Sequence, residues 1–117
     1  MKRILVVDDN SINRKLAVAL LNRHGWEAME AESGEGAIAV LADEIFDAVL
    51  LDISMPGMDG ETVCQQIRAD PRLAGLRVVA YTAHAMEHEK RRIMSAGFDD
   101  IVIKPMTPEV LYAALQG

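Results

Sequence analysis

Short apolar segments alternate with longer amphipathic segments along the whole chain. Four of the apolar segments are dense in Val, Ile and Leu and lack polar alternation, as strands covered on both faces of a sheet do. They are residues 4–7, 48–51, 78–81 and 101–103. A fifth, more polar segment at residues 26–31 alternates and predicts an edge strand.

Segments with helical spacing follow each of these strands. We expect helices at about 11–23, 34–43, 60–69, 85–95 and 108–116. Residues that cap helix N-termini stand at three of the expected starts, namely Asn10 or Ser11, Asp59 and Thr107. Gly25 and Gly97 follow helices at positions where a left-handed residue would end them.

Five alternating strand and helix units predict an α/β fold with an open parallel sheet and helices on both faces. At 117 residues the chain has the length of one domain, and we expect a single domain over residues 1–117. Ligands of such sheets bind beyond the carboxyl ends of the strands. Candidate site residues are therefore sought at those ends.

Composition excludes several classes of protein. The formal charge of −6, from 18 acidic and 12 basic residues, disfavours direct nucleic-acid binding because it repels phosphate backbones. The longest apolar runs, residues 16–21 and 37–42, are far shorter than the ~18 residues of a membrane span. No signal peptide is evident. The single cysteine, Cys64, fits a reducing compartment, and we expect a cytoplasmic protein without membrane contact.

Polar residues stand just past the ends of four predicted strands. They are Asp8, Asp9, Asp52, Thr82 and Lys104. Each alone is most simply a cap, turn or surface residue. Together they converge on one rim, where three carboxylates repel one another unless a cation lies among them. One lysine cannot neutralise three carboxylates, and carboxylate oxygens with a backbone carbonyl suit Mg²⁺.

A metal, a hydroxyl and an ammonium beside a carboxylate resemble the machinery of phosphoryl transfer. An aspartate can attack phosphorus, and Asp52 is the candidate nucleophile because it lies on the central strand, between the acidic pair and the side of Thr82 and Lys104. We expect Asp52 to lie at a solvated rim. Lys104 would supply a point charge to the phosphoryl oxygens, and Thr82 a hydroxyl.

Four segments in this order, 7–10, 51–60, 81–83 and 103–105, carry a resemblance to a known family. They are Val-Asp-Asp-Asn, Leu-Asp-Ile-Ser-Met-Pro-Gly-Met-Asp-Gly, Tyr-Thr-Ala and Ile-Lys-Pro. With these motifs the sequence resembles the receiver domain of response regulators in two-component signalling. The resemblance implies a flavodoxin-like strand order of 2-1-3-4-5 and a cis peptide bond between Lys104 and Pro105.

The resemblance also implies a function. Asp52 would take a phosphoryl group from a phosphohistidine of a histidine kinase or phosphotransfer protein, change the protein's surface and slowly lose the group. The implied Mg²⁺ ligands are Asp8, Asp9, Asp52 and the Ser54 carbonyl, with Mn²⁺ as a substitute. Thr82, Ala83 and Lys104 would contact the phosphoryl group.

One position departs from the family pattern. Many members carry an aromatic residue three before the lysine, where this chain has Ile101. Tyr81 cannot simply replace it, because side chains alternate along a strand and Tyr81 should point to the face opposite Thr82. We therefore expect the conformational change to be carried by the Thr82-Ala83-His84 backbone and by the fourth helix, which has few apolar positions. A downstream protein target would recognise the changed surface.

A docking surface for the phosphodonor is expected over the first helix and the loop after the fifth strand. Ile12, Pro105 and Met106 would form its apolar centre, with Arg14 and Lys15 at its polar rim. The alternative is that Ile12 packs inward against Leu16.

Other functions remain as alternatives. An aspartyl-phosphate phosphatase would normally carry an Asp-x-Asp pair after the first strand, and a flavin or nucleotide carrier would not have two acids there. A phosphate-independent module would normally lack one of the five site residues. With no output domain expected, the chain is either a stand-alone regulator or the receiver of a hybrid kinase. His84 and His88 are more simply exposed polar residues than metal ligands.

Overall fold

The computed structural model describes residues 2–83 and 86–117, and its parallel sheet has the expected topology. The strands are β1 (Arg3–Val7), β2 (Glu27–Ala31), β3 (Ala48–Asp52), β4 (Arg77–Thr82) and β5 (Asp100–Ile103). Their order in the sheet is β2-β1-β3-β4-β5, and every neighbouring pair is parallel. The α/β class and the 2-1-3-4-5 order are therefore confirmed.

The helices alternate with the strands as the sequence predicts. They are α1 (Ser11–Arg23), α2 (Gly34–Asp43), α3 (Gly60–Ala69), α4 (Glu87–Ser95) and α5 (Pro108–Gln116). The bounds of all except α4 match the expected ones. The expected start of α4 at Ala85 lies outside the described residues, as does His84. Asn10, Asp59 and Thr107 each accept a backbone hydrogen bond as N-caps.

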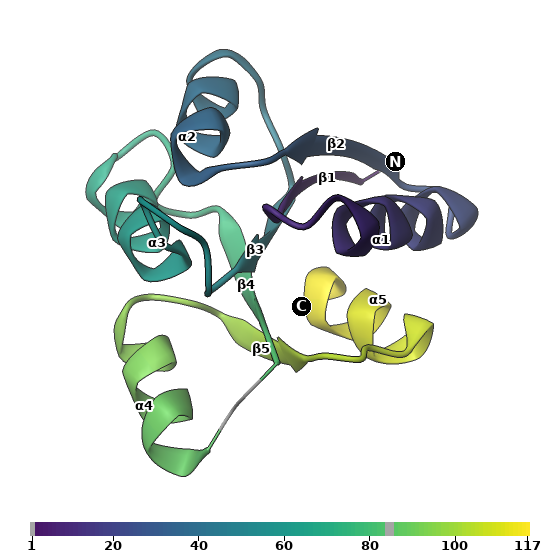
Figure 1. Ribbon diagram of the computed structural model, residues 1–117. Helices are drawn as coiled ribbons and strands as arrows, with labels where there is room; N and C mark the ends of the chain where they lie inside the picture. Colours follow the sequence, from purple (N-terminus) through teal and green to yellow (C-terminus); the bar gives the residue numbers. More distant parts are fainter. Residues whose placement is uncertain (1, 84–85) are drawn as a thin grey trace.

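Two layers of helices cover the two faces of the sheet (Figure 1). Helices α1 and α5 lie on one face and close a core that includes Ala17, Leu21 and Leu111. Helices α2, α3 and α4 lie on the other face, with α3 and α4 contributing Ile67 and Ile93 to the second core. All five residues of β3 are buried, as expected for a central strand covered on both faces.

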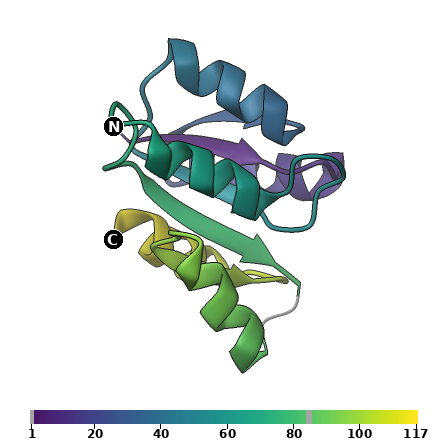
Figure 2. The ribbon, with the colours of Figure 1, turned by 90° about the vertical axis from the view of Figure 1, so that its left-hand side faces the viewer.

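All strands point in the same direction, so their carboxyl ends share one edge of the sheet (Figure 2). The register pairs Val7 with Leu51, Asp52 with Tyr81, and Thr82 with Ile103. The residues that end β1, β3 and β4, and the one that follows β5, are thereby placed side by side.

No helix within residues 2–83 and 86–117 has both the length and the apolar character needed to cross a membrane.

The start of α3 packs directly against the end of β3 because residue 60 is glycine. A Cβ atom added at Gly60 would lie 2.3 Å from the Asp52 carbonyl oxygen and 2.9 Å from Ile53 Cα. The Gly60 N–H donates to the Ile53 carbonyl at 3.2 Å, which fixes this close approach. The loop of residues 53–59 is therefore closed tightly over the end of β3.

We predict that Gly60→Ala destabilises the protein by about 1 to 3 kcal/mol, because backbone atoms of Asp52 and Ile53 must move to admit the methyl group. Gly75→Ala is the matched control, since a Cβ atom at Gly75 meets nothing within 4 Å. It should change the free energy of unfolding by less than about 0.5 kcal/mol. Urea unfolding measures both, and equal effects of the two substitutions would contradict this packing.

Candidate functional site

Three carboxylates converge at the carboxyl edge of the sheet. Asp8 and Asp9 follow β1, Asp52 ends β3, and one carboxylate oxygen of each lies within 4.8 Å of the others. Asp8 is 0% exposed and Asp52 is 3% exposed, whereas Asp9 is exposed. The expected convergence is confirmed. The expected solvated position of Asp52 is wrong, because this residue is 3% exposed at the end of the buried strand β3.

Backbone amides hold two of the carboxylates in place. The Asn10 N–H donates to Asp8 Oδ1 at 2.9 Å, and the Ser54 N–H donates to Asp52 Oδ1 at 3.1 Å. Each amide lies two residues beyond its aspartate, an arrangement typical of Asx turns. The aspartates thus fold the loops that follow their own strands.

One carboxylate oxygen at this site has no hydrogen-bond partner among the described residues. This atom is the buried Asp8 Oδ2. A buried acceptor without a partner is costly, and a divalent cation that prefers oxygen ligands would satisfy it. The oxygen-only donor set of Asp8, Asp9 and Asp52 therefore fits Mg²⁺.

Lys104 supplies the positive charge at this edge. Its Nζ lies 3.6 Å from Asp52 Oδ1 and 3.8 Å from Asp8 Oδ2. The Lys104 backbone N–H donates to the Thr82 carbonyl at 2.8 Å, which ties the end of β5 to the end of β4. The peptide bond from Lys104 to Pro105 is cis, as expected. Thr82 is buried beside the site and Ala83 is exposed.

Burial raises the pKa of Asp52 to about 6, because the ionised carboxylate loses contact with water. The Ser54 N–H and the Lys104 ammonium oppose this change, and the Asp8 carboxylate adds to it. Asp52 is thus less acidic than an exposed aspartate and binds a proton in competition with any cation below about pH 6.

Arg14 stabilises the loop that follows β1, a role that the sequence analysis did not predict. Its Nη1 donates to the Asp8 carbonyl and its Nε to Glu30 Oε1, each at 2.8 Å. The side chain is buried, so its expected place at the polar rim of a docking surface is wrong. Lys15 does stand at the surface, where its Nζ lies 2.8 Å from Glu30 Oε2.

The apolar residues expected at the docking surface are largely accessible. Ile12 is 78% exposed on the first turn of α1, and Pro105 is also exposed. Met106 is partly buried against the core under α1 and α5. Leu16 is itself half exposed, so the alternative in which Ile12 packs inward against Leu16 is not what the structure contains.

Tyr81 and Ile101 lie on opposite faces of the sheet. Tyr81 packs in the core under α1 and α5, and Ile101 packs against the core under α2, α3 and α4. The expectation that Tyr81 points away from the usual aromatic position is therefore confirmed. Its ring lies close to Lys104, with 4.3 Å between Nζ and the ring centroid.

Helix α4 is attached to the rest of the protein by few contacts. Within Glu87–Ser95, which the structure describes in full, Ile93 is the only buried residue. The N-cap residue Met86 makes no side-chain capping bond. Arg92 Nε lies 2.8 Å from Glu61 Oε1, and an exposed ion pair of this kind adds little stability. Both residues line a hollow of about 420 Å³ that Ser54 also lines.

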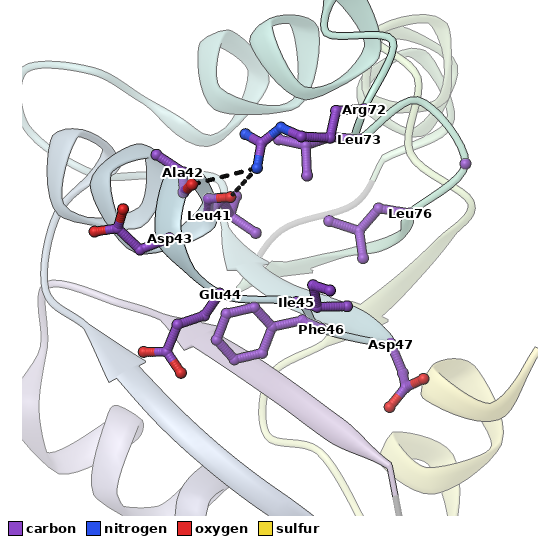
Figure 3. A pocket seen from close by; sticks show the side chains of 11 residues that line it. Leu41, Ala42, Asp43, Glu44, Ile45, Phe46, Asp47, Arg72, Leu73 and Leu76 are labelled. Carbon is purple, nitrogen blue, oxygen red and sulfur yellow. Dashed lines mark hydrogen bonds between the residues drawn. The ribbon is translucent and has the colours of Figure 1, made fainter.

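A larger hollow of about 630 Å³ lies at the opposite edge of the sheet, between the loops that precede β3 and β4. Figure 3 shows Phe46 and Leu76 in its wall, with the Asp43 and Asp47 carboxylates at well-separated places on its rim. Arg72 Nη1 donates to the Leu41 carbonyl at 3.2 Å. Because these acids do not converge, this hollow lacks the chemistry of the carboxyl edge.

Comparison with known protein families gives an independent assignment. The family of the response regulator receiver domain matches residues 4–116. The sensor protein GacS of Pseudomonas syringae pv. syringae is 42% identical over 112 residues, which is 93% of this chain. The chain spans only 12% of the length of GacS.

Solved structures share the whole fold. CheY4, a chemotaxis protein of Vibrio cholerae, superposes with a TM-score of 0.93 at 27% identity and covers 99% of this chain and 97% of its own. The receiver domain of the sensor histidine kinase PA1611 from Pseudomonas aeruginosa PAO1 gives a TM-score of 0.91 at 29% identity, over 98% of this chain and 94% of its own. That structure contains a magnesium ion in its active-site cleft.

We predict that Asp52→Asn stabilises the metal-free protein in a pH-dependent way. Because the pKa of Asp52 rises from 3.8 to about 6 on folding, ionisation costs stability above about pH 6 and nothing below about pH 4. The substitution should raise the free energy of unfolding by roughly 1 to 3 kcal/mol at pH 7, and the gain should vanish towards pH 4.

Urea unfolding in the presence of a chelator, at a series of pH values, measures this gain. Asp43→Asn is the control, because Asp43 is exposed at the end of α2. It should change the free energy of unfolding by less than about 0.5 kcal/mol at every pH. A gain for Asp52→Asn that is independent of pH would contradict the burial argument.

Proposed function

The chain belongs to the response regulator receiver domain family and is a receiver domain of two-component signalling, and from this premise we propose that Asp52 accepts a phosphoryl group from a phosphohistidine. The observation that supports this most is the convergence of Asp8, Asp9 and Asp52 beside the Lys104 ammonium. No single structural role accounts for three carboxylates held together at one edge of a sheet.

In the proposed transfer, an oxygen of the Asp52 carboxylate attacks the phosphorus atom of a partner's phosphohistidine. The new oxygen–phosphorus bond forms as the phosphorus–nitrogen bond breaks, and the imidazole leaves with the electron pair and takes up a proton. The product is an acyl phosphate on Asp52. Slow attack by water on the same phosphorus atom returns the free carboxylate and inorganic phosphate.

We assign Asp8, Asp9, Asp52 and the Ser54 carbonyl as the residues that would hold Mg²⁺. When bound, the ion would offset the charge of the carboxylates and of the incoming phosphoryl oxygens. Mn²⁺ would substitute, since it takes the same carboxylate and carbonyl ligands. The buried Asp8 Oδ2, which accepts no hydrogen bond from the described residues, supports this assignment.

Lys104 and Thr82 would orient the phosphoryl group. The Lys104 ammonium is 3.6 Å from Asp52 Oδ1 and can pair with a phosphoryl oxygen in its neighbourhood. The Thr82 side chain stands at the end of β4 and would bond a second oxygen, with the backbone of Ala83 beside it. These contacts align the reacting groups and stabilise charge, which is the main catalytic contribution in phosphoryl transfer.

The output of phosphorylation is a rearrangement of α4 and its leading segment. Four residues separate Thr82 from the start of α4 at Glu87. Because Ile93 is the only buried residue within Glu87–Ser95, little free energy opposes movement of this helix. Because position 101 is isoleucine, the change proceeds by repacking of the backbone after Thr82, without a ring flip. A shift of a few kcal/mol between two packings would change the affinity for a downstream protein target.

The proposed partners are a histidine kinase or a histidine phosphotransfer protein upstream, and a protein target downstream. The net charge of −6 argues against direct contact with nucleic acid. We propose a cytoplasmic location and one domain over residues 1–117, acting alone or as the receiver of a hybrid kinase. The donor would dock over Ile12, Pro105 and Met106, with Lys15 at the rim.

Labelling with acetyl phosphate and Mg²⁺, followed by intact mass and peptide mapping, tests the proposed acceptor. Wild-type protein should gain one phosphoryl group on Asp52, and Asp52→Asn should gain none while it keeps its fold. Labelling should also be lost on chelation of Mg²⁺. Full labelling of Asp52→Asn, or labelling that survives chelation, would rule out the proposed acceptor or its metal.

Ile12→Asp tests the docking surface. It should slow phosphoryl transfer from a phosphorylated histidine phosphotransfer domain about tenfold, because it places a charge in the apolar centre, and leave labelling by acetyl phosphate unchanged. Ile45→Asp is the control, since Ile45 is also highly exposed, at 85%, and lies at the opposite edge. Equal slowing with both donors would show a folding defect instead, and an unchanged rate with the protein donor would remove Ile12 from the docking surface.

A further inference from the structure

The aromatic ring of Tyr81 faces the ammonium group of Lys104. The distance of 4.3 Å from Nζ to the ring centroid is well inside the ~6 Å within which a cation and an aromatic ring attract each other. Tyr81 is 3% exposed and the Lys104 side chain is 20% exposed, so water screens this contact only weakly. A cation–π contact strengthens as its cation is desolvated.

Tyr81 is fixed between the two strands that carry the reacting groups. The register places it beside Asp52 of β3 on one side and beside Val102 of β5, two residues before Lys104, on the other. Its ring packs in the core under α1 and α5, and its carbonyl accepts from the Ile53 N–H at 3.1 Å. The ring therefore offers Lys104 a rigid surface next to the phosphate acceptor.

The Lys104 ammonium lies too far from the two carboxylates to donate hydrogen bonds to them. The separations of 3.6 Å to Asp52 Oδ1 and 3.8 Å to Asp8 Oδ2 exceed the ~2.7 to 3.2 Å of a nitrogen–oxygen hydrogen bond. The attraction of these carboxylates also changes when Asp52 is phosphorylated or when a cation is bound among them. The attraction of the neutral ring does not, because burial and the two carboxylates raise the pKa of Tyr81 to about 12.

We infer that Tyr81 is a positioning residue of this site, whose ring face holds the Lys104 ammonium beside the Asp52 carboxylate before and during phosphoryl transfer. This inference rests on the proposed function, since it assigns Tyr81 a part in the reaction of Asp52. Tyr81 itself makes and breaks no bond. Its hydroxyl is not needed for this role, because the attraction comes from the face of the ring.

Two substitutions distinguish the effect of the aromatic ring face from the effects of side-chain volume and of the hydroxyl group. Tyr81→Leu should slow labelling by acetyl phosphate about 5- to 30-fold, the loss that corresponds to one partly desolvated cation–π contact. Tyr81→Phe keeps the ring face and should label within about twofold of wild type. Val79→Ala is the matched control, because Val79 is buried on the same strand and in the same core, two residues away. It should lower stability without slowing labelling.

A spectroscopic readout follows the contact independently of the reaction. The ε-methylene protons of Lys104 adjoin Nζ, which lies over the ring, so they should resonate upfield in wild type and in Tyr81→Phe. They should return towards random-coil positions in Tyr81→Leu. A double-mutant cycle adds a second test: in a Lys104→Met background, Tyr81→Leu should cause no further slowing.

The outcomes distinguish this inference from the proposed function. If wild type is labelled on Asp52 and folded Tyr81→Leu is labelled at the same rate, Tyr81 does not position Lys104. Slowing that persists in the Lys104→Met background would also overturn the inference, because it would show a structural effect. If wild type is not labelled, the proposed function fails, and the Lys104 shifts still decide whether the contact exists. Random-coil chemical shifts of the Lys104 ε-methylene protons in wild type would refute the contact.

Discussion

Mutual repulsion among three carboxylates governs the carboxyl edge of this sheet. Asp8 and Asp52 follow or end two adjacent central strands, β1 and β3, both of which are covered by helices on both faces. The side chains cannot separate without breaking this packing, so the apolar core offsets the cost of holding like charges together. Burial within this packing is the main cause of the raised pKa of Asp52, to which the Asp8 carboxylate adds, and Asp8 Oδ2 is left without a hydrogen-bond partner among the described residues.

The site has one rigidly supported side and one weakly supported side. Towards α1 and α5, Arg14 bonds to the Asp8 carbonyl and the Tyr81 ring lies against the Lys104 ammonium. Towards α4, Ile93 is the only buried residue within Glu87–Ser95, and Arg92 forms an exposed pair with Glu61. A change of charge at Asp52 therefore meets least resistance towards α4, which accounts for a movable output surface beside a fixed reaction centre.

Local patterns in the sequence predict most of the fold and the identity of the site. Apolar runs and helix caps determine the elements, and the shared direction of parallel strands brings Asp8, Asp52 and Lys104 to one edge. Burial of the charged groups could not be predicted in this way. Arg14 points inward because Glu30 on β2 and the Asp8 carbonyl bind it, and Asp52 is buried at the end of a strand that helices cover on both faces. Such burial depends on segments that are far apart in the sequence and meet only in the folded protein.

The central expectation is that a divalent cation offsets the charge of the carboxylates and of a phosphoryl group on Asp52, and that this bound group shifts α4. Titration of the wild-type protein with beryllofluoride, a phosphoryl analogue, in the presence and absence of Mg²⁺ measures this directly by amide NMR. With Mg²⁺ present, beryllofluoride should shift the amides of residues 52–54, 82–83, 104 and 87–95 and leave the interior of α1 little changed, whereas without Mg²⁺ it should shift none of them. Saturable beryllofluoride binding without Mg²⁺, or a response confined to α1, would contradict it.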